Sequence, residues 1–533
     1  MLFRRERRII YPIFEKEVFS MNETEKTDGA NGASVPKKEG FFRRLSRPAD
    51  LTGGTPWKVI LLYAAPIMLS YLLQQIYVLT DAIICGQVLS AEQVAGVNDT
   101  FPLTFIFLQF AFGCTAGFSV ITAGMVGRND KAGTRRSFVT QIYLSLVISA
   151  ILTAISIPCL PALLGVINVT PQNKEVYDAA YVYCFIIFIG IFAQMGYNFI
   201  CGVLRAYGDS VTPLIFLIIS TALNVGLDLL FLIPLKKGPA GAAIATVLAQ
   251  LISFVLCTVY TFAKYKDLRL KKDDWKVPGS AFLQHLKQGV PLGLQFSVLA
   301  VGIIVMQGAA VKFDVGENGA MTAGTPAQNG YGAATKLINF LMAFYNGLGS
   351  AILGYNAQNY GSGNYRRIKK GTLQTLAIML VIFAFCFAAG MLLSIGGAYQ
   401  YIFMSEDKIS AESIRFGNAY IYVDISLYFV LGFLIVVRSA VQGICKPSYV
   451  LGAGVTELVA RIFACAFLPV LVNGGEITSS ASHAAFVALC FGDPFAWFTA
   501  SVLLCVPLVK YILLMKYKTP GKNPAEITGG AER

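Results

Sequence analysis

Long apolar segments follow one another along this chain, and short polar connections separate them. A helix needs about 20 predominantly apolar residues to cross a bilayer, and twelve segments reach that length. They lie near residues 58–82, 100–126, 137–160, 180–202, 212–234, 239–263, 288–311, 334–358, 371–395, 419–440, 449–472 and 492–515. The pattern predicts an all-α polytopic membrane protein with twelve transmembrane helices.

The composition and the placement of charge support this interpretation. Only 14% of the 533 residues are charged, whereas soluble domains carry about 25%. The net charge of +13 could suggest a nucleic-acid binder, but Lys and Arg cluster in alternate connections, and segments 83–99 and 473–491 contain none. Such alternation follows the positive-inside rule, so we expect both termini to be cytoplasmic. The excess charge favours contact with anionic membrane lipids rather than nucleic acid.

Cysteine and histidine give no sign of a cofactor. The eleven cysteines are scattered without a CxxC pair, so neither a disulfide framework nor a metal site is indicated. His285 and His483 lie in or near connections and are expected at the surface. No GxSxG or HExxH motif is present, so the sequence does not predict an enzyme.

The terminal segments differ in composition from the spans. Residues 1–55 are rich in Lys, Glu and Gly, which predicts a disordered cytoplasmic tail, and 516–533 form a second cytoplasmic tail. Met21 is an alternative start to Met1.

The chain also repeats itself. "AGMVGRNDKAGTRR" follows the second span, and "AQNYGSGNYRRIKK" follows the eighth. We therefore expect two six-helix lobes, 56–263 and 288–515, joined by a cytoplasmic linker at 264–287. Both lobes start from the same side, so the repeat is parallel, as in many secondary transporters. Two insertions, at 312–331 and 473–491, interrupt the second lobe, and the first is expected to form an outer loop.

Polar residues inside the first lobe attract most interest. Asn224 and Asp228 are four residues apart in "STALNVGLDLLFLIP" and project from one helix face. An aspartate near the centre of a span costs about 2.5–3.5 kcal/mol. Asp81 lies late in span 1, and Thr246 lies early in span 6, which runs the opposite way. All four residues therefore belong to the outer half of the membrane.

Two chemical roles fit two carboxylates, an amide and a hydroxyl. Their hard oxygens could bind a small cation, or the carboxylates could share a proton. The alternative is a hydrogen-bond network that joins the helices, which is favoured for Asn224 and Thr246 taken alone. Apart from Lys58 at the very start of span 1, no Lys or Arg lies in these spans, so for the two aspartates a functional site is favoured.

The second lobe differs chemically from the first. Glu457 and Arg461 are one helical turn apart and can neutralise each other, so they are predicted to form a structural ion pair, although they could line the cavity floor. Asp424, near the start of span 10, is ambiguous because one turn nearer the surface water would solvate it. Uncompensated negative charge is therefore expected mainly in the first lobe.

Several motifs, in order, resemble the multidrug and toxic compound extrusion (MATE) family. They are Pro66 with Asp81 in span 1, "GVLRAYGDSVTP", "NVGLD", "GPAGAAIATVLAQ", and "ELVAR" followed by "AW". The resemblance covers roughly residues 56–515. It implies a V-shaped antiporter that expels organic cations in exchange for H⁺ or Na⁺. It also implies a cation site at Asp81, Asn224, Asp228 and Thr246.

The resemblance extends to a hinge and to a branch of the family. Pro66 falls on the bending proline of span 1. Span 7 offers only Gln295 where NorM-like members have an acidic residue, so the chain looks closer to the DinF-like or MepA-like branch. A multi-pass protein of the bacterial inner membrane, acting as a monomer, is implied.

The substrate side of the hypothesis depends on other span residues. The expected cavity residues are Gln74, Tyr77, Tyr197 and Asn198, and the expected substrates are small organic cations. The nearest alternative is a lipid-linked oligosaccharide flippase of the same superfamily. It would need basic residues inside the lumen, where Arg461 is the only clear one and has Glu457 beside it. The coupling ion and the substrate stay open.

Overall fold

The computed structural model describes residues 48–514. The two predicted tails fall almost entirely outside these residues. Within them the chain is helical, and the one β-type pairing is an isolated bridge between Val315 and Met321.

Twelve membrane-spanning units are present. Ten helices of the described part are singly long and apolar enough to cross a membrane, and two bent helix pairs pass together. The pairs are α7–α8, bent by 44°, and α15–α16, bent by 52°. The prediction of an all-α protein with twelve spans is therefore confirmed.

The helices of the first lobe are α3 (Pro56–Val88), α4 (Ala91–Asp99), α5 (Phe101–Gly127), α6 (Lys131–Val166), α7 (Lys174–Ile189), α8 (Ile191–Ala206), α9 (Val211–Leu232) and α10 (Pro239–Lys264). Those of the second are α11 (Gly279–Val311), α12 (Pro326–Gly361), α13 (Tyr365–Ser394), α14 (Ala398–Phe403), α15 (Ala411–Ser426), α16 (Tyr428–Gly443), α17 (Pro447–Asn473), α18 (His483–Cys490) and α19 (Gly492–Leu508). Short 3₁₀ turns and a π turn at Val509–Leu513 complete the described chain.

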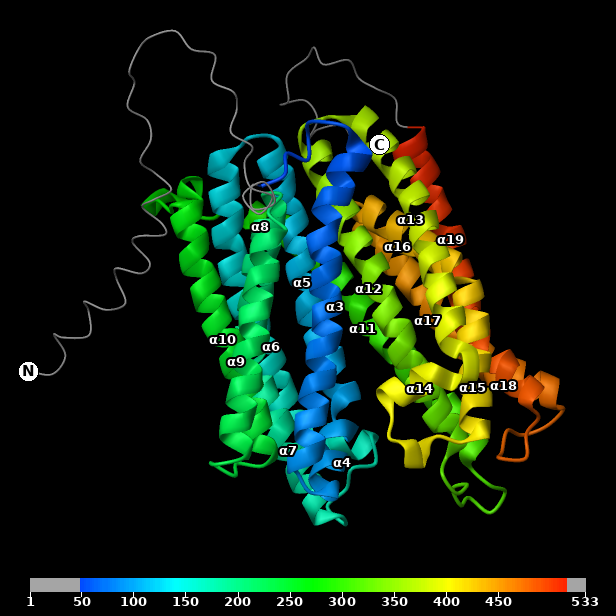
Figure 1. The fold of residues 1–533 in the computed structure, drawn as a ribbon. Coiled ribbons are helices and arrows are strands. Elements are labelled where there is room, and N and C mark those ends of the chain that lie inside the picture. The colour runs from blue at the N-terminus through cyan, green and yellow to red at the C-terminus, as the bar shows by residue number, and fades with distance from the viewer. Residues whose placement is uncertain (1–47, 515–533) are drawn as a thin grey trace, which may run out of the picture. The chain divides into compact units, whose positions relative to one another are not determined.

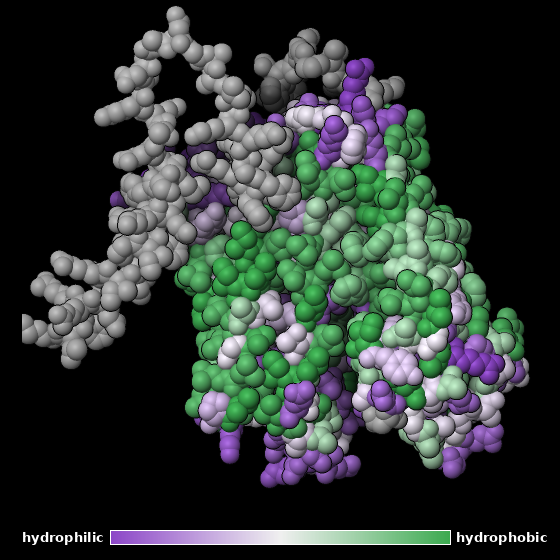
Figure 2. All heavy atoms as spheres, viewed as in Figure 1, coloured by the Kyte–Doolittle hydropathy of each residue, from purple (hydrophilic) through white to green (hydrophobic). Residues whose placement is uncertain are grey.

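The helices form two bundles side by side, with α3 between them (Figure 1). We call the end where α3 begins the basic end, because Arg128, Lys264 and Arg367 lie there, and we call the opposite end the far end. Figure 2 shows a wide apolar band with hydrophilic residues gathered at both ends. It also shows a groove between the lobes that opens at the far end.

Three segments differ from the sequence expectation. Helix α11 begins at Gly279, inside the predicted linker 264–287, because helices extend into the polar interface that a hydropathy pattern excludes. The insertion at 473–491 contains helix α18. His285, expected at the surface, is buried, with Ser137 Oγ 2.8 Å from Nε2 and the Ala281 carbonyl oxygen 2.8 Å from Nδ1.

The linker that remains between α10 and α11 is attached to the first lobe. Arg135 Nε lies 2.8 Å from Asp274 Oδ2, and Lys131 Nζ lies 3.1 Å from Asp267 Oδ1. Burial raises the pKa of Asp274, but hydrogen bonds from the Lys271 backbone N–H and from Arg135 outweigh it and lower that pKa.

Helix α3 packs against both lobes. Its residues up to Tyr71, among them Ile60, Tyr63 and Ile67, belong to the core of the second lobe. Farther along, Ile84 and Cys85 pack with Leu232 of the first lobe. Residues 72–80 belong to neither core. Pro66 lies in the first of these two regions, buried within one continuous helix. Its expected role as a hinge stays a prediction.

Close backbone packing of α5 against α11 joins the lobes directly. A Cβ atom on Gly117 would meet the Gln288 carbonyl oxygen at 2.6 Å, and one on Gly113 would meet the Leu292 carbonyl oxygen at 2.7 Å. Only glycine permits helices to approach this closely, as is common between membrane helices.

A second connection lies at the basic end, where residues 49–54 precede α3. Arg367 of the second lobe donates to the carbonyl oxygens of Gly53 (2.6 Å), Gly54 (2.7 Å) and Leu51 (3.3 Å). On its other side, this segment donates from Ala49 N to Gly208 O of the first lobe at 3.0 Å. We call this arrangement the basic-end strap. It holds the two lobes together opposite the open groove.

The α5–α11 packing yields a stability prediction. Gly117→Ala should lower the melting temperature of the purified protein, because the added methyl group forces the two backbones apart at a cost of about 1–3 kcal/mol. Gly308→Ala is the matched control in α11, where nothing lies within 4 Å of the added Cβ. Thermal unfolding in detergent measures both. Equal melting temperatures would show that the helices are not in close contact.

Candidate functional site

The far half of the first lobe brings the two predicted aspartates together. Asp81 lies in the second half of α3, and Asp228 lies near the end of α9, which packs against α3. The two carboxyl groups interact directly across this contact. Asp228 is completely buried.

This carboxyl pair lacks hydrogen-bond donors. Both oxygens of Asp228 and Oδ1 of Asp81 are buried without a partner in the described part of the chain. No Lys or Arg contributes to the surroundings of either carboxyl. Two carboxylates at close range in a low-dielectric site repel each other unless a proton or a cation lies between them. The pair therefore requires one positive charge that the described chain does not supply.

The remaining predicted ligands lie beside the pair. Asn224 Nδ2 donates to Thr246 Oγ1 at 3.4 Å, which joins α9 to α10. That bond leaves Asn224 Oδ1 buried without a donor. Tyr77 of α3 contacts Thr246 and interacts with both aspartates. The structure thus places Asp81, Asn224, Asp228 and Thr246 together, with a surplus of acceptor oxygens.

Two neighbours of this cluster were missed by sequence reasoning. Tyr183 of α7 and Cys85 of α3 both interact with Asp81. Tyr183 lies in an ordinary apolar segment, "YVYCFIIFI", and no spacing rule singles it out. The described residues contain no group of three or more His, Cys, Asp or Glu side chains that could hold a metal ion.

The four predicted cavity residues do not share one environment. Gln74 is exposed in the part of α3 that packs in neither core, and Asn198 is half-buried. Tyr77 belongs to the aspartate site. Tyr197 is only 9% exposed and packs in the core of the first lobe with its hydroxyl 3.5 Å from the Pro213 carbonyl oxygen. Tyr197 therefore packs in the core of the first lobe, and its expected role in lining the cavity stays a prediction.

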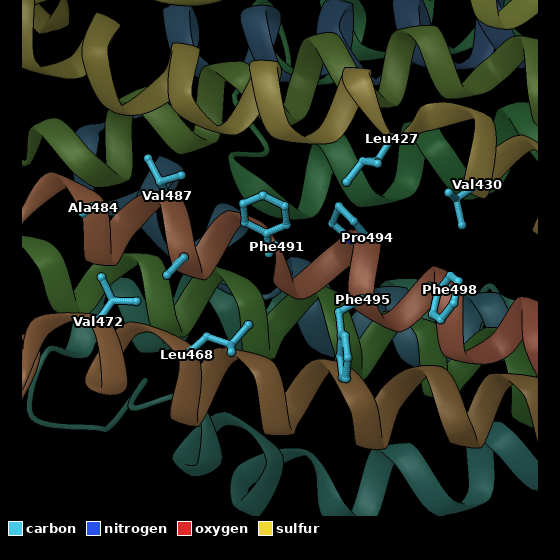
Figure 3. Close-up of a pocket in the computed structure, with 11 residues that line it drawn as sticks. Leu427, Val430, Leu468, Val472, Ala484, Val487, Phe491, Pro494, Phe495 and Phe498 are labelled. Atoms are coloured by element: carbon cyan, nitrogen blue, oxygen red, sulfur yellow. The ribbon is translucent and has the colours of Figure 1, made fainter.

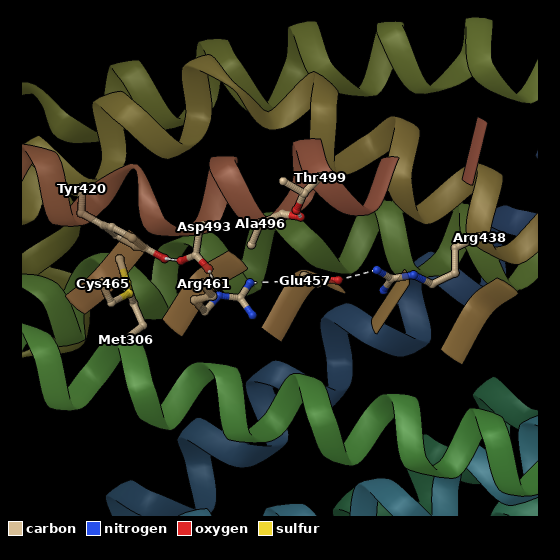
Figure 4. A network of polar contacts seen from close by, with 9 residues as sticks. All are labelled: Met306, Tyr420, Arg438, Glu457, Arg461, Cys465, Asp493, Ala496 and Thr499. Carbon is tan, nitrogen blue, oxygen red and sulfur yellow. Dashed lines mark hydrogen bonds and ion pairs between the residues drawn. The ribbon is translucent and has the colours of Figure 1, made fainter. Parts of the chain in front are cut away.

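The second lobe contains a buried ionic network rather than one ion pair (Figure 4). Glu457 does pair with Arg461, at 3.3 Å from Nη2 to Oε1, and also with Arg438 of α16. Arg461 Nε lies 2.7 Å from Asp493 Oδ1 of α19, and Asp493 accepts a 2.9 Å hydrogen bond from the Tyr420 hydroxyl. The sequence could not reveal Arg438 and Asp493, since they lie on separate spans.

Asp424 corrects a further expectation. It is completely buried beside this network, and neither of its oxygens accepts a hydrogen bond from the described chain. Water does not solvate it, because the α15–α16 break places it inside the bundle. Uncompensated negative charge is thus present in both lobes.

A cavity of about 610 Å³ opens in the second lobe (Figure 3). Its lining is entirely apolar: Leu427, Val430, Leu468, Val472, Ala484, Val487, Ala488, Phe491, Pro494, Phe495 and Phe498. It lacks the polar side chains that orient a ligand, so we do not assign a functional site to it.

The ionic network predicts that neutralising Glu457, which lies at its centre, strongly lowers the stability of the protein. Glu457→Gln removes the one acidic partner that the buried Arg438 has among residues 48–514, and an uncompensated buried charge costs about 3–5 kcal/mol. We expect a markedly lower melting temperature in detergent. Glu476→Gln, at an exposed site, serves as control and should leave it unchanged. A stable Glu457→Gln protein would show that Arg438 finds another partner.

Known proteins are similar to this chain in sequence and in fold. The MatE family model matches residues 66–230 and again 321–467, one match in each lobe. The probable multidrug resistance protein YpnP of Bacillus subtilis is 31% identical over 60% of this chain and 68% of its own. The multidrug export protein MepA of Staphylococcus haemolyticus is 22% identical over 66% of this chain and 75% of its own.

Solved structures agree on the fold. A MATE structure in the straight conformation superposes with a TM-score of 0.75 at 20% identity, covering 87% of this chain and 98% of that one. An outward-facing multidrug-resistance MATE transporter gives 0.73, at 20% identity over 86% and 96%. With family matches over most of both lobes and this shared two-lobe architecture, the chain belongs to the MATE family of membrane efflux transporters.

Proposed function

We propose that this protein is a secondary antiporter that exports small organic cations in exchange for H⁺ or Na⁺. The observation that carries the proposal is the Asp81–Asp228 pair, buried without a hydrogen-bond donor or a basic neighbour. A coupling cation would bind between these carboxyl groups. Sodium would add ligands from Asn224 Oδ1 and Thr246, since it prefers hard oxygen atoms.

Exchange follows from competition for negative charge. With the site empty, the pair attracts a cationic substrate into the adjacent groove. Once H⁺ or Na⁺ neutralises the pair, that attraction is lost and the substrate is released. Coupling of this kind requires that ion and substrate favour different conformations of the transporter.

Helix α3 is suited to transmit the change. Its far half carries Asp81 against the first lobe, and its near half packs against α12 of the second lobe through Met68 and Tyr71. A change of charge at Asp81 alters how the far half packs, and Pro66 offers a place where the helix can bend.

The orientation of the structure fits one state of a transport cycle. By the positive-inside rule, the basic end would face the cytoplasm. The groove opens at the other end, so this conformation faces outward. Alternating access then requires that the basic-end strap and the nearby α3–α12 contacts separate. The location would be the bacterial inner membrane.

The substrate class rests on relatives and charge. Two relatives are named for multidrug resistance or export, whereas a 23% identical relative from Shewanella oneidensis is named an FAD transporter. The flippase alternative depended on a free basic residue at Arg461, but that side chain is neutralised by Glu457 and Asp493. Small organic substrates are therefore favoured.

Asp228→Asn tests the proposal, because it keeps the shape of the side chain and removes its charge. In proteoliposomes with ethidium, we expect transport to fall at least tenfold while the protein stays folded. Gradients of H⁺ and Na⁺ imposed separately identify the coupling ion.

Asp424→Asn is the comparison variant, since it removes the other unpartnered buried carboxylate. Normal ethidium transport by Asp228→Asn, with loss in Asp424→Asn, would overturn the assignment to the first lobe. If neither the H⁺ gradient nor the Na⁺ gradient drives transport by the wild-type protein, antiport itself is overturned.

A further inference from the structure

An arginine near the lobe interface has no acidic partner among the residues that the structure describes. Arg205 lies in the last turn of α8, is half-buried, and forms no hydrogen bond or ion pair through its guanidinium within residues 48–514. Its backbone carbonyl, by contrast, accepts a 2.8 Å hydrogen bond from the Tyr63 hydroxyl. The backbone of Arg205 is therefore held in place, whereas its guanidinium group has no counter-charge among the described residues.

The nearest acidic residue is not available to neutralise it. Asp209 is buried and already holds Lys264 Nζ at 2.8 Å, the Tyr265 hydroxyl at 2.8 Å and the Thr212 hydroxyl at 2.7 Å. Arg205 is therefore an excess cation beside a satisfied ion pair.

The side chain points from the basic end toward the membrane interior. Helical side chains tilt toward the N-terminus of their helix, and α8 runs toward the basic end. Consistent with this direction, the guanidinium interacts with Tyr71, Tyr63 and Tyr197. Tyr71 also contacts Ser350 of α12, at 3.1 Å between hydroxyl oxygens. Arg205 therefore lies near a contact between α3 and α12.

Burying an unpaired charge in a membrane protein is costly, so an intramembrane arginine without a partner indicates a ligand or a pathway. We propose that Arg205 is an anion-binding subsite. It receives a carboxylate or phosphate group of a substrate at the inner end of the groove between the lobes. Tyr63 and Tyr71 flank it and suit an aromatic body.

The subsite complements the aspartate pair. Ten residues of α3 separate Tyr71 from Asp81, which is about 15 Å of helix. The groove between the lobes would then present the positive Arg205 at its inner end and the negative Asp81–Asp228 pair farther out. Substrates with a cationic and an anionic group on an aromatic frame fit both. Binding at Arg205 does not involve the coupling ion. The anion-binding proposal can therefore be tested separately from the proposal of antiport.

Binding to the purified full-length protein tests this inference with two matched probe pairs. Rhodamine B carries a carboxylate that its ethyl ester lacks, and flavin mononucleotide carries a phosphate that riboflavin lacks. Fluorescence anisotropy measures all four affinities. We expect the wild type to prefer the carboxylate- or phosphate-bearing member of at least one pair over the partner that lacks this group by about tenfold or more, and which pair responds separates carboxylate from phosphate.

Arg205→Gln should abolish that preference while leaving affinity for the ester or riboflavin within about twofold, which also shows that the variant is folded. Arg205→Lys should retain most of the preference, because it keeps the charge. Arg269→Gln, at an exposed arginine in the linker, should match the wild type.

Two results would overturn the proposal. One is a wild-type protein that shows no preference in either pair, and the other is an Arg205→Gln variant that keeps the preference. Loss of transport in Asp228→Asn with the anion preference intact would separate the two sites.

Discussion

The division of α3 between two lobes is the constraint on which the rest of this structure depends. Its near half is buried in the core of the second lobe through Ile60, Tyr63 and Ile67, and its far half is packed on the first. The lobes cannot rock apart or together without bending α3 or repacking one of its halves. Because Asp81 lies in the far half, the site and the lobe interface are parts of the same helix.

The buried charges of the two lobes differ in whether they are paired with an opposite charge. In the second lobe, Glu457 and Asp493 neutralise Arg438 and Arg461. These ion pairs hold helices α16, α17 and α19 together. In the first lobe, Asp81 and Asp228 face each other without a counter-charge. An unpaired buried charge within a membrane protein points to a functional site, and we propose that a mobile ion completes this one. This contrast, rather than the number of acidic residues, distinguishes a site from a structural network.

Sequence reasoning reached the fold and most of the site because both depend on local patterns. Twelve apolar segments define the spans, and the four-residue spacing of Asn224 and Asp228 places them on one face. It failed where partners come from distant spans. Arg438, Asp493 and Tyr183 have no local signature, and Asp424 could not be recognised as buried without the α15–α16 bend. The burial of Tyr197 in the core of the first lobe was not foreseen either, because helical spacing does not say which neighbour a face meets.

The basic-end strap has one consequence for how this protein can vary. Every acceptor that Arg367 uses in Leu51, Gly53 and Gly54 is a main-chain carbonyl. The strap itself therefore makes no use of the side chains at these positions, although Leu51 is buried in the core of the second lobe and Gly54 has a φ of +65° that favours glycine. Inserting or deleting a residue here would shift all three acceptors at once, so chain length between Leu51 and the start of α3 is the property that this contact constrains.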